Sequence, residues 1–103
     1  MNNLYSLLNQ LISLSQEIGE LLNQDRYEEL NPLMSQRAVL YEELRKREDL
    51  LGPEMLPFLK ELRALEESVE QLAREKKKAI AQKLSQIPRK KEALKAYEGY
   101  RAL

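Results

Sequence analysis

Three glutamates, Glu66, Glu67 and Glu70, come closest in this chain to the spacing of a catalytic or metal-binding group. On a helix they lie within one or two turns of each other, as carboxylates that share acid–base work or a metal ion do. The chain of 103 residues, however, has no histidine and no cysteine. It therefore lacks the commonest general base, the commonest transition-metal ligand, any thiol nucleophile and the Glu-x-x-His motif of di-iron bundles. We expect no catalysis, no cofactor and no metal site.

A basic cluster near the C-terminus is the second group of side chains that could bind something. Residues 1–73 hold 14 acidic and 7 basic residues, whereas residues 74–103 hold 3 acidic and 10 basic residues, so net charges of −7 and +7 cancel. Nucleic-acid binding would require a recognised module or aromatic side chains among the charges, and only Tyr97 and Tyr100 lie near, so we expect none. A solvated helix end and a site for an acidic protein remain open as explanations. The cluster consists of Arg74, Lys76, Lys77, Lys78, Lys83, Arg89, Lys90 and Lys91.

A narrow apolar strip overlaps the basic cluster. Between lysines and glutamates, the apolar positions thin out to those of a single helix face, which is typical of a helix that docks an amphipathic partner helix. Ordinary solvated helix surface is the alternative. The strip comprises Val69, Leu72, Ala73, Ala79, Ile80 and Leu84.

The N-terminal segment has a broader apolar face. Its apolar residues recur at intervals of three and four, which places them on one side of a helix. We interpret this stripe as the core of a helical bundle, and Gly19 within it as a tolerated surface glycine. The stripe comprises Leu4, Leu7, Leu11, Leu14, Ile18 and Leu21.

Composition and turn signals predict an all-α fold. Leu, Glu, Lys, Arg, Gln and Ala, which are good helix formers, dominate a chain with three glycines. We expect one domain over residues 1–103, with helices at about 2–23, 26–50, 54–86 and 89–100. Asp25 with Glu28 resembles a capping box at the start of the second helix, and Pro32 either kinks that helix or begins it after an Asn31 cap. Gly52-Pro53 marks the next turn.

Short turns between long helices favour antiparallel neighbours. We therefore expect an elongated antiparallel helical hairpin or bundle of three main helices, with a short C-terminal fourth helix. A slender fold of this kind buries little apolar surface per residue, so a partner or a second copy in a homodimer would help to cover its stripes. The chain shows no signal peptide and no stretch apolar enough to span a membrane, and we expect a cytoplasmic protein.

Two segments resemble those of FliT-type flagellar export chaperones. Residues 14–22 (LSQEIGELL) and 25–30 (DRYEEL) are similar to the first helix of that family and the turn after it. Residues 84–97, with a basic segment before Ala96-Tyr97, resemble its passage into a C-terminal helix. The nearest rival is the FlgN-type chaperone for hook–filament junction proteins. A structural coiled-coil or assembly adaptor without a chaperone role is a further alternative.

The resemblance implies a chaperone that binds the filament cap protein FliD, prevents its premature assembly and delivers it to the export ATPase complex. It also implies that the C-terminal helix masks the surface that binds the client. By position, Leu94 and Tyr97 would be the apolar contacts of this masking helix. Val69, Leu72, Ala73, Ile80 and Leu84 would form the surface beneath it. Lys76, Lys77, Lys78, Arg89, Lys90 and Lys91 would steer the client toward that surface.

Overall fold

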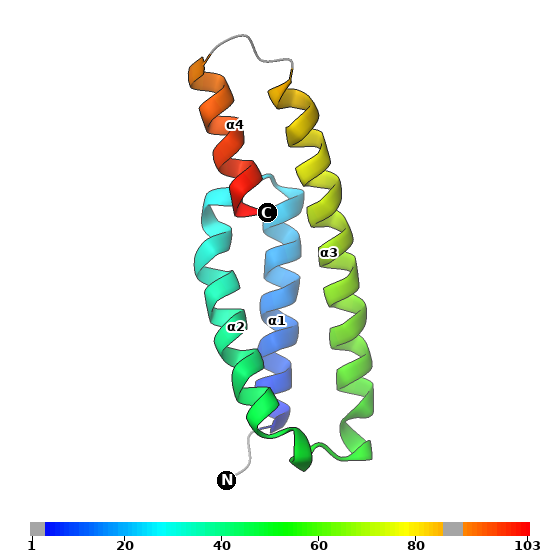
Figure 1. The fold of residues 1–103 in the computed structure, drawn as a ribbon. Helices are drawn as coiled ribbons and strands as arrows, with labels where there is room; N and C mark the ends of the chain where they lie inside the picture. The colour runs from blue at the N-terminus through cyan, green and yellow to red at the C-terminus, as the bar shows by residue number, and fades with distance from the viewer. Residues whose placement is uncertain (1–3, 86–89) are drawn as a thin grey trace.

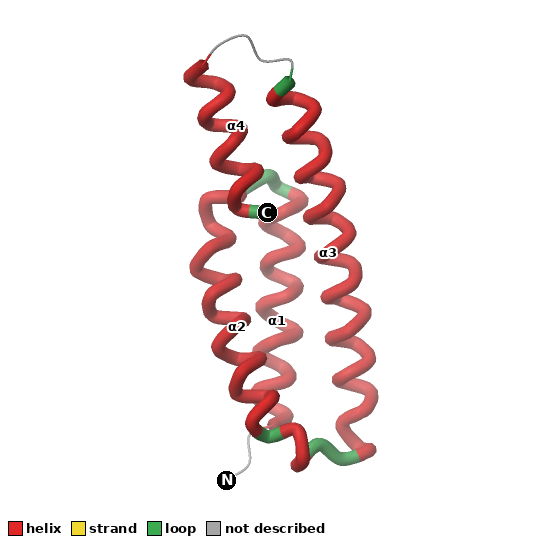
Figure 2. Tube along the Cα trace, in the orientation of Figure 1, coloured by secondary structure: helices red, strands yellow, loops and turns green. Residues whose placement is uncertain are grey.

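The computed structural model describes residues 4–85 and 90–103, and this part of the chain contains helices and turns but no strand (Figure 2). The prediction of an all-α fold is confirmed. Single turns of 3-10 helix, η1, η2 and η3, connect the longer elements. The elements are α1 (Leu4–Asn23), η1 (Tyr27–Glu29), α2 (Leu30–Lys46), η2 (Glu48–Leu50), η3 (Pro53–Met55), α3 (Leu56–Leu84) and α4 (Lys90–Ala102).

Three long helices, α1, α2 and α3, form the body of an elongated molecule of 56 × 20 × 19 Å, and α2 runs antiparallel to the other two (Figure 1). Helix α1 packs against both α2 and α3. Helix α4 runs back along the far end of α3, and the C-terminus returns to the turn between α1 and α2 (Figure 1).

The core consists of two apolar clusters along the bundle axis. All six residues of the predicted α1 stripe are at most 8% exposed, which confirms that this face is core. The lower cluster, at the α2–α3 turn, comprises Leu4, Leu7, Leu8, Leu11, Ile12, Met55 and Leu62. The upper cluster, near the α1–α2 turn, comprises Ile18, Leu21, Leu22, Leu30 and Val69.

A polar layer lies between the two clusters and joins all three helices. Ser15 of α1 is fully buried, and its hydroxyl donates a hydrogen bond to Glu66 of α3. The other carboxylate oxygen of Glu66 accepts a hydrogen bond from Nη1 of Arg37 on α2 at 3.1 Å. A partly buried carboxylate with two donors is satisfied only when all three helices are in register. The layer therefore fixes how the helices align along the axis.

The turn after α1 differs from the predicted capping box. Asp25 has φ of 57°, in the left-handed region. The amide of Arg26 donates to the carbonyl of Leu21 at 2.9 Å, and the amide of Asp25 donates to that of Leu22 at 3.2 Å. This pair of bonds is a Schellman motif with Asp25 in the position that glycine usually takes. Asp25 thus ends α1 and does not cap the next helix.

The predicted second helix over 26–50 is divided in the structure. It consists of η1, α2 and η2, and the residue flanking α2 at its start is Glu29, so Asn31 is not the cap. Pro32 lies in the first turn of α2, where the amide it lacks would have no partner within the helix. The proline therefore needs no kink.

Replacing Arg37 with methionine should destabilise the bundle by about 1–3 kcal/mol, because it leaves the Glu66 carboxylate short of a charged donor in a half-buried site. The matched control is Arg63→Met, which removes an ion pair with Glu67 whose side chains are 83% and 67% exposed. The control should change stability by less than about 0.5 kcal/mol. Urea unfolding followed by circular dichroism measures both, and equal effects would show that the polar layer has no special role.

Candidate partner-binding surface

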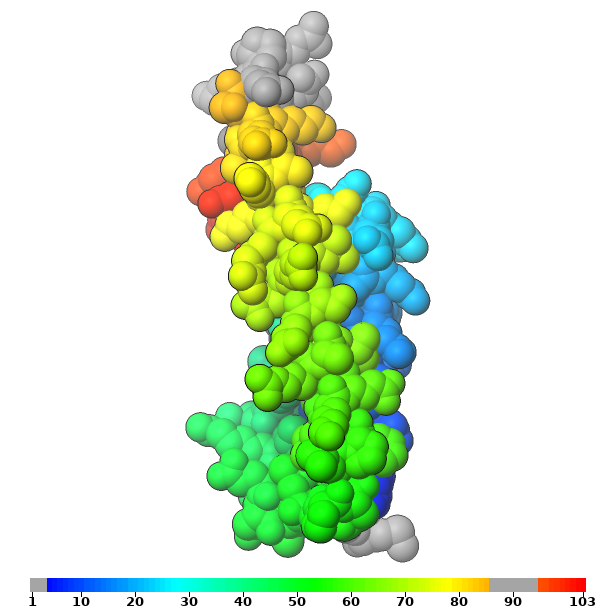
Figure 3. Space-filling model, turned by 90° about the vertical axis from the view of Figure 1, so that its right-hand side faces the viewer, coloured from blue at the N-terminus to red at the C-terminus, as the bar shows by residue number. Residues whose placement is uncertain are grey.

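Helix α3 is longer than the helices it packs against. It has 29 residues, whereas α1 has 20 and α2 has 17. Lys76 of α3 contacts Asp25 in the α1–α2 turn, so residues 77–84 extend past that turn by about 12 Å at about 1.5 Å per residue. Figure 3 shows this end of α3 rising beyond α1. Among the described elements, α4 is the main cover for this projecting end.

The strip predicted to bind a partner is divided between two environments. Val69 is 8% exposed and belongs to the upper cluster, against which Leu72 and Ala73 pack at its edge. Ile80 is 9% exposed, although it lies beyond the α1–α2 turn, and Leu84 is half-buried. The first half of the strip is therefore core, and the second half lies on the projecting end of α3. The role of these residues in partner binding stays a prediction.

Gly99 brings α4 close to the body. It is buried, and a Cβ placed on it would lie 2.9 Å from Cδ2 of Tyr27 and 3.5 Å from Cδ1 of Ile80. Only glycine allows the α4 backbone to approach both η1 and α3 this closely. Leu103, just after α4, packs against the upper cluster. Helix α4 therefore approaches Ile80 with its backbone at Gly99.

Tyr97, predicted to be a masking contact, is half-exposed, and its masking role stays a prediction. Its side chain is 49% exposed and stacks on Tyr100, with ring centroids 6.2 Å apart. Tyr100 in turn lies beneath Lys77, whose Nζ is 4.6 Å from the ring centroid. Gly99 must face the three-helix body, which fixes the rotation of α4 about its own axis. Tyr97 therefore lies to one side of the face that contacts the body. Leu94 is on α4, but its side chain lies outside the described residues.

The carboxylate of Asp25 joins α3 to the turn on which α4 rests. Its Oδ1 accepts hydrogen bonds from Nζ of Lys76 at 2.8 Å and from the hydroxyl of Tyr27 at 2.7 Å. The bond from Lys76, and next the bond from Tyr27, lower the pKa of Asp25. Burial and the same bond to Asp25 raise the pKa of Tyr27 to about 12. Tyr27 is thus held in the position where its ring meets Gly99.

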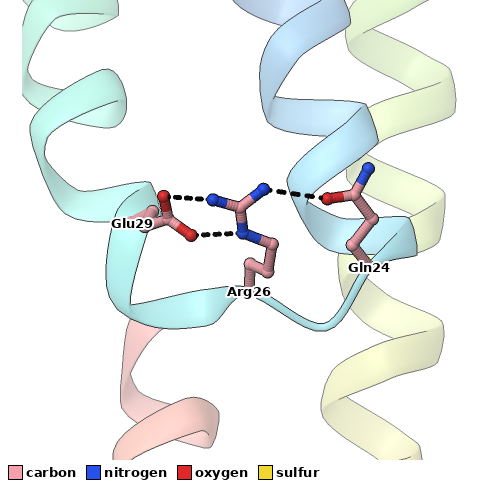
Figure 4. A network of polar contacts seen from close by, with 3 residues as sticks. All are labelled: Gln24, Arg26 and Glu29. Atoms are coloured by element: carbon pink, nitrogen blue, oxygen red, sulfur yellow. Dashed lines mark hydrogen bonds and ion pairs between the residues drawn. The ribbon is translucent and has the colours of Figure 1, made fainter.

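Arg26, the next residue, braces the other side of the turn (Figure 4). Its guanidinium makes a two-pronged contact with Glu29, in which Nη2 lies 2.6 Å from Oε1, and its Nη1 donates to Oε1 of Gln24 at 3.1 Å. The hydrogen bond to Glu29 raises the pKa of Arg26. This contact is exposed, so it orients η1 more than it stabilises the fold.

The predicted steering residues differ in whether they contact other groups within the molecule. Lys76 and Lys77 are engaged within the molecule, one with Asp25 and the other on the Tyr100 ring. Lys78 is exposed and makes no ion pair with a described residue. Arg89 and the side chains of Lys90 and Lys91 lie outside the described residues. Two of the six thus position α3 and α4, and the steering role of the set stays a prediction.

The sequence pattern missed the residues that hold α4. Asp25, Tyr27 and Tyr100 were recognised only as turn or aromatic residues, and Gly99 was not considered. One signal was available: Ala96, Gly99 and Leu103 follow each other at intervals of three and four, which places two small residues and a leucine on one helix face.

The family model described as "Flagellar protein FliT" matches residues 5–99, which is nearly the whole chain. The chain belongs to the FliT family. This membership implies a flagellar export chaperone and decides against the FlgN-type alternative. Neither a curated protein nor a solved structure matches the chain. None of the helices described for this FliT-family protein is long and apolar enough to cross a membrane.

Adding one methyl group to Gly99 should loosen α4, because Gly99→Ala places a Cβ 2.9 Å from the ring of Tyr27. Amide hydrogen exchange over residues 95–102 should then become at least about tenfold faster, the equivalent of about 1.4 kcal/mol of lost docking. The control is Gly19→Ala, whose Cβ would lie at an ordinary 3.6 Å from Cγ2 of Val69. Because it removes a glycine from a helix interior, the control should stabilise the protein by about 1 kcal/mol. Unchanged exchange in Gly99→Ala would mean that α4 is not held through this contact.

Alkaline pH should destabilise the fold through two tyrosines. Burial, and next the Glu66 charge, raise the pKa of Tyr41 to about 12, as burial and Asp25 do for Tyr27. These pKa values are higher in the folded than in the unfolded chain, so the protonated tyrosines favour the folded state. This contribution to the free energy of unfolding is fully present below about pH 10 and is lost as the pH rises toward 12. Absorbance at the phenolate band and urea midpoints between these pH values test this. A pH dependence unaltered in a Tyr27→Phe, Tyr41→Phe double variant would contradict the assignment.

Proposed function

We propose that this protein binds the flagellar filament cap protein FliD in the cytoplasm, keeps it from assembling prematurely and passes it to the export ATPase complex. Its membership in the FliT family supports this proposal. The observation that carries it is the projecting end of α3, whose apolar side chain Ile80 has α4 as a cover. A chaperone needs an apolar surface that can be offered to a client and withheld in its absence.

The proposed mechanism is recognition of one helix by another. An amphipathic terminal segment of FliD would fold against α3 along Ile80 and Leu84, with Leu72 and Ala73 at the lower end of the same face. Val69 would support this face from inside the upper cluster. Lys78, with Arg89, Lys90 and Lys91 nearby in sequence, would attract an acidic client segment during approach.

Helix α4 is suited to give way to such a client. It has 13 residues, which is marginal for a helix that receives little tertiary support, and it contains Gly99 in its interior. Exchanging it for a longer amphipathic helix would retain cover over Ile80 and add apolar contacts. The buried hydrophobic residues of both core clusters lie within residues 4–69, so the three-helix body supplies them without α4, and Leu103 adds a partly buried contact to the upper cluster.

Truncation after Ile87 tests this mechanism. Binding of the FliD terminal segment, measured by isothermal titration calorimetry, should be retained or should tighten by up to about tenfold, as expected if α4 docking is worth about 1.4 kcal/mol. Circular dichroism serves as the folding control. Clearly weaker binding by a folded truncated protein would make α4 a part of the binding surface. No binding by either form would favour a structural adaptor over a chaperone of FliD.

A further inference from the structure

The lysines and arginines are paired very differently at the two ends of the molecule. Among described residues up to 73, every lysine and arginine except Lys60 makes an ion pair with a carboxylate. Along the described part of the projecting end, four exposed cations make none: Lys78, Lys83, Lys95 and Arg101. Positive charge there is available to something outside the molecule.

Three of these cations converge on one groove. The α3–α4 groove is an open cavity of 1110 Å³ between α3, α4 and the α1–α2 turn, and Lys83, Lys95 and Arg101 line it. Its lining includes the small residues Ala79, Ala96, Gly99 and Ala102, together with the larger Ile80 and Tyr27. The groove exists only while α4 is docked, since α4 supplies one wall.

Negative charges also line the groove and narrow the choice of occupant. Asp25 is neutralised by Lys76, whereas Glu28 and Glu98 line the groove without an ion pair to any side chain that the structure describes. A uniform polyanion such as nucleic acid would be repelled by both carboxylates and would gain nothing from the alanine lining. A peptide with spaced carboxylates and small apolar residues would match both features.

We propose that the α3–α4 groove binds an acidic, amphipathic segment of a partner protein while α4 remains docked. The carboxylates of the segment pair with Lys83, Lys95 and Arg101, and its apolar residues contact Ala79, Ala96 and Ala102 beside the nearly buried Ile80. This site does not depend on FliD as the client. An acidic segment bound in the groove stabilises the docked form of α4. A client that binds α3 requires α4 to leave, so the segment and the client exclude one another.

The probe is a fluorescent peptide of glutamate, alanine and leucine with helical spacing, added to the full-length protein and followed by anisotropy. A Lys95→Glu, Arg101→Glu double variant should bind it at least about tenfold more weakly. The neutral Lys95→Gln, Arg101→Gln variant should show a smaller loss in the same direction. The matched control, Lys60→Glu, reverses the exposed unpaired cation of the body and should leave binding unchanged. Circular dichroism checks that each variant is folded.

Equal binding by the wild type and the charge-reversed double variant would overturn the proposal. So would equal binding of a peptide in which lysines replace the glutamates, or tighter binding of duplex DNA or of phosphatidylserine vesicles than of the acidic peptide. Binding of the FliD segment is measured on the wild type as well as on the double variant. If the wild type binds the acidic peptide as expected but not the FliD segment, only the proposed function is in doubt. If the wild type binds the FliD segment but not the acidic peptide, only the groove is in doubt.

Discussion

The difference in length between α3 and the α1–α2 hairpin is the constraint on which the rest of this molecule depends. Helix α3 continues about eight residues past the α1–α2 turn, and Ile80 there would be exposed to water if nothing folded back over it. Helix α4 covers this end of α3, but it is short and approaches α3 at a glycine, Gly99. The body is thus a closed bundle, and the end beyond it is a two-helix unit with much less buried surface.

Asp25 is where these two parts meet. Its left-handed backbone ends α1, and its carboxylate binds Lys76 of α3 and Tyr27, whose ring limits how near α4 can come. The three roles suit a short acidic side chain: aspartate tolerates the left-handed region better than most residues, and it reaches both donors. The sequence RYEEL that follows places the Arg26–Glu29 contact on the outer side of the same turn. Changes at this turn should therefore affect the body and α4 together.

Features that depend on residues close together in the sequence could be predicted, and features that depend on contacts between distant residues could not. The α1 stripe follows from intervals of three and four within one helix, and its burial was correctly predicted. The polar layer and the Asp25 contact join residues 29 to 51 positions apart, and no local pattern pairs them. The rotation of α4 about its own axis depends on Gly99 fitting against Tyr27, a tertiary contact that no local sequence pattern reveals. Asp25 was predicted to be a cap because its spacing to Glu28 suits a capping box, but its backbone forms the Schellman motif that ends α1.

The central claim is that a client reaches α3 by displacing α4. Hydrogen exchange on the full-length protein, with and without the FliD terminal segment, tests it most directly. The account predicts that amides of residues 95–102 lose protection when the segment binds, while those of residues 77–84 keep or gain it. Bound client with α4 amides as protected as before, or more so, would contradict it.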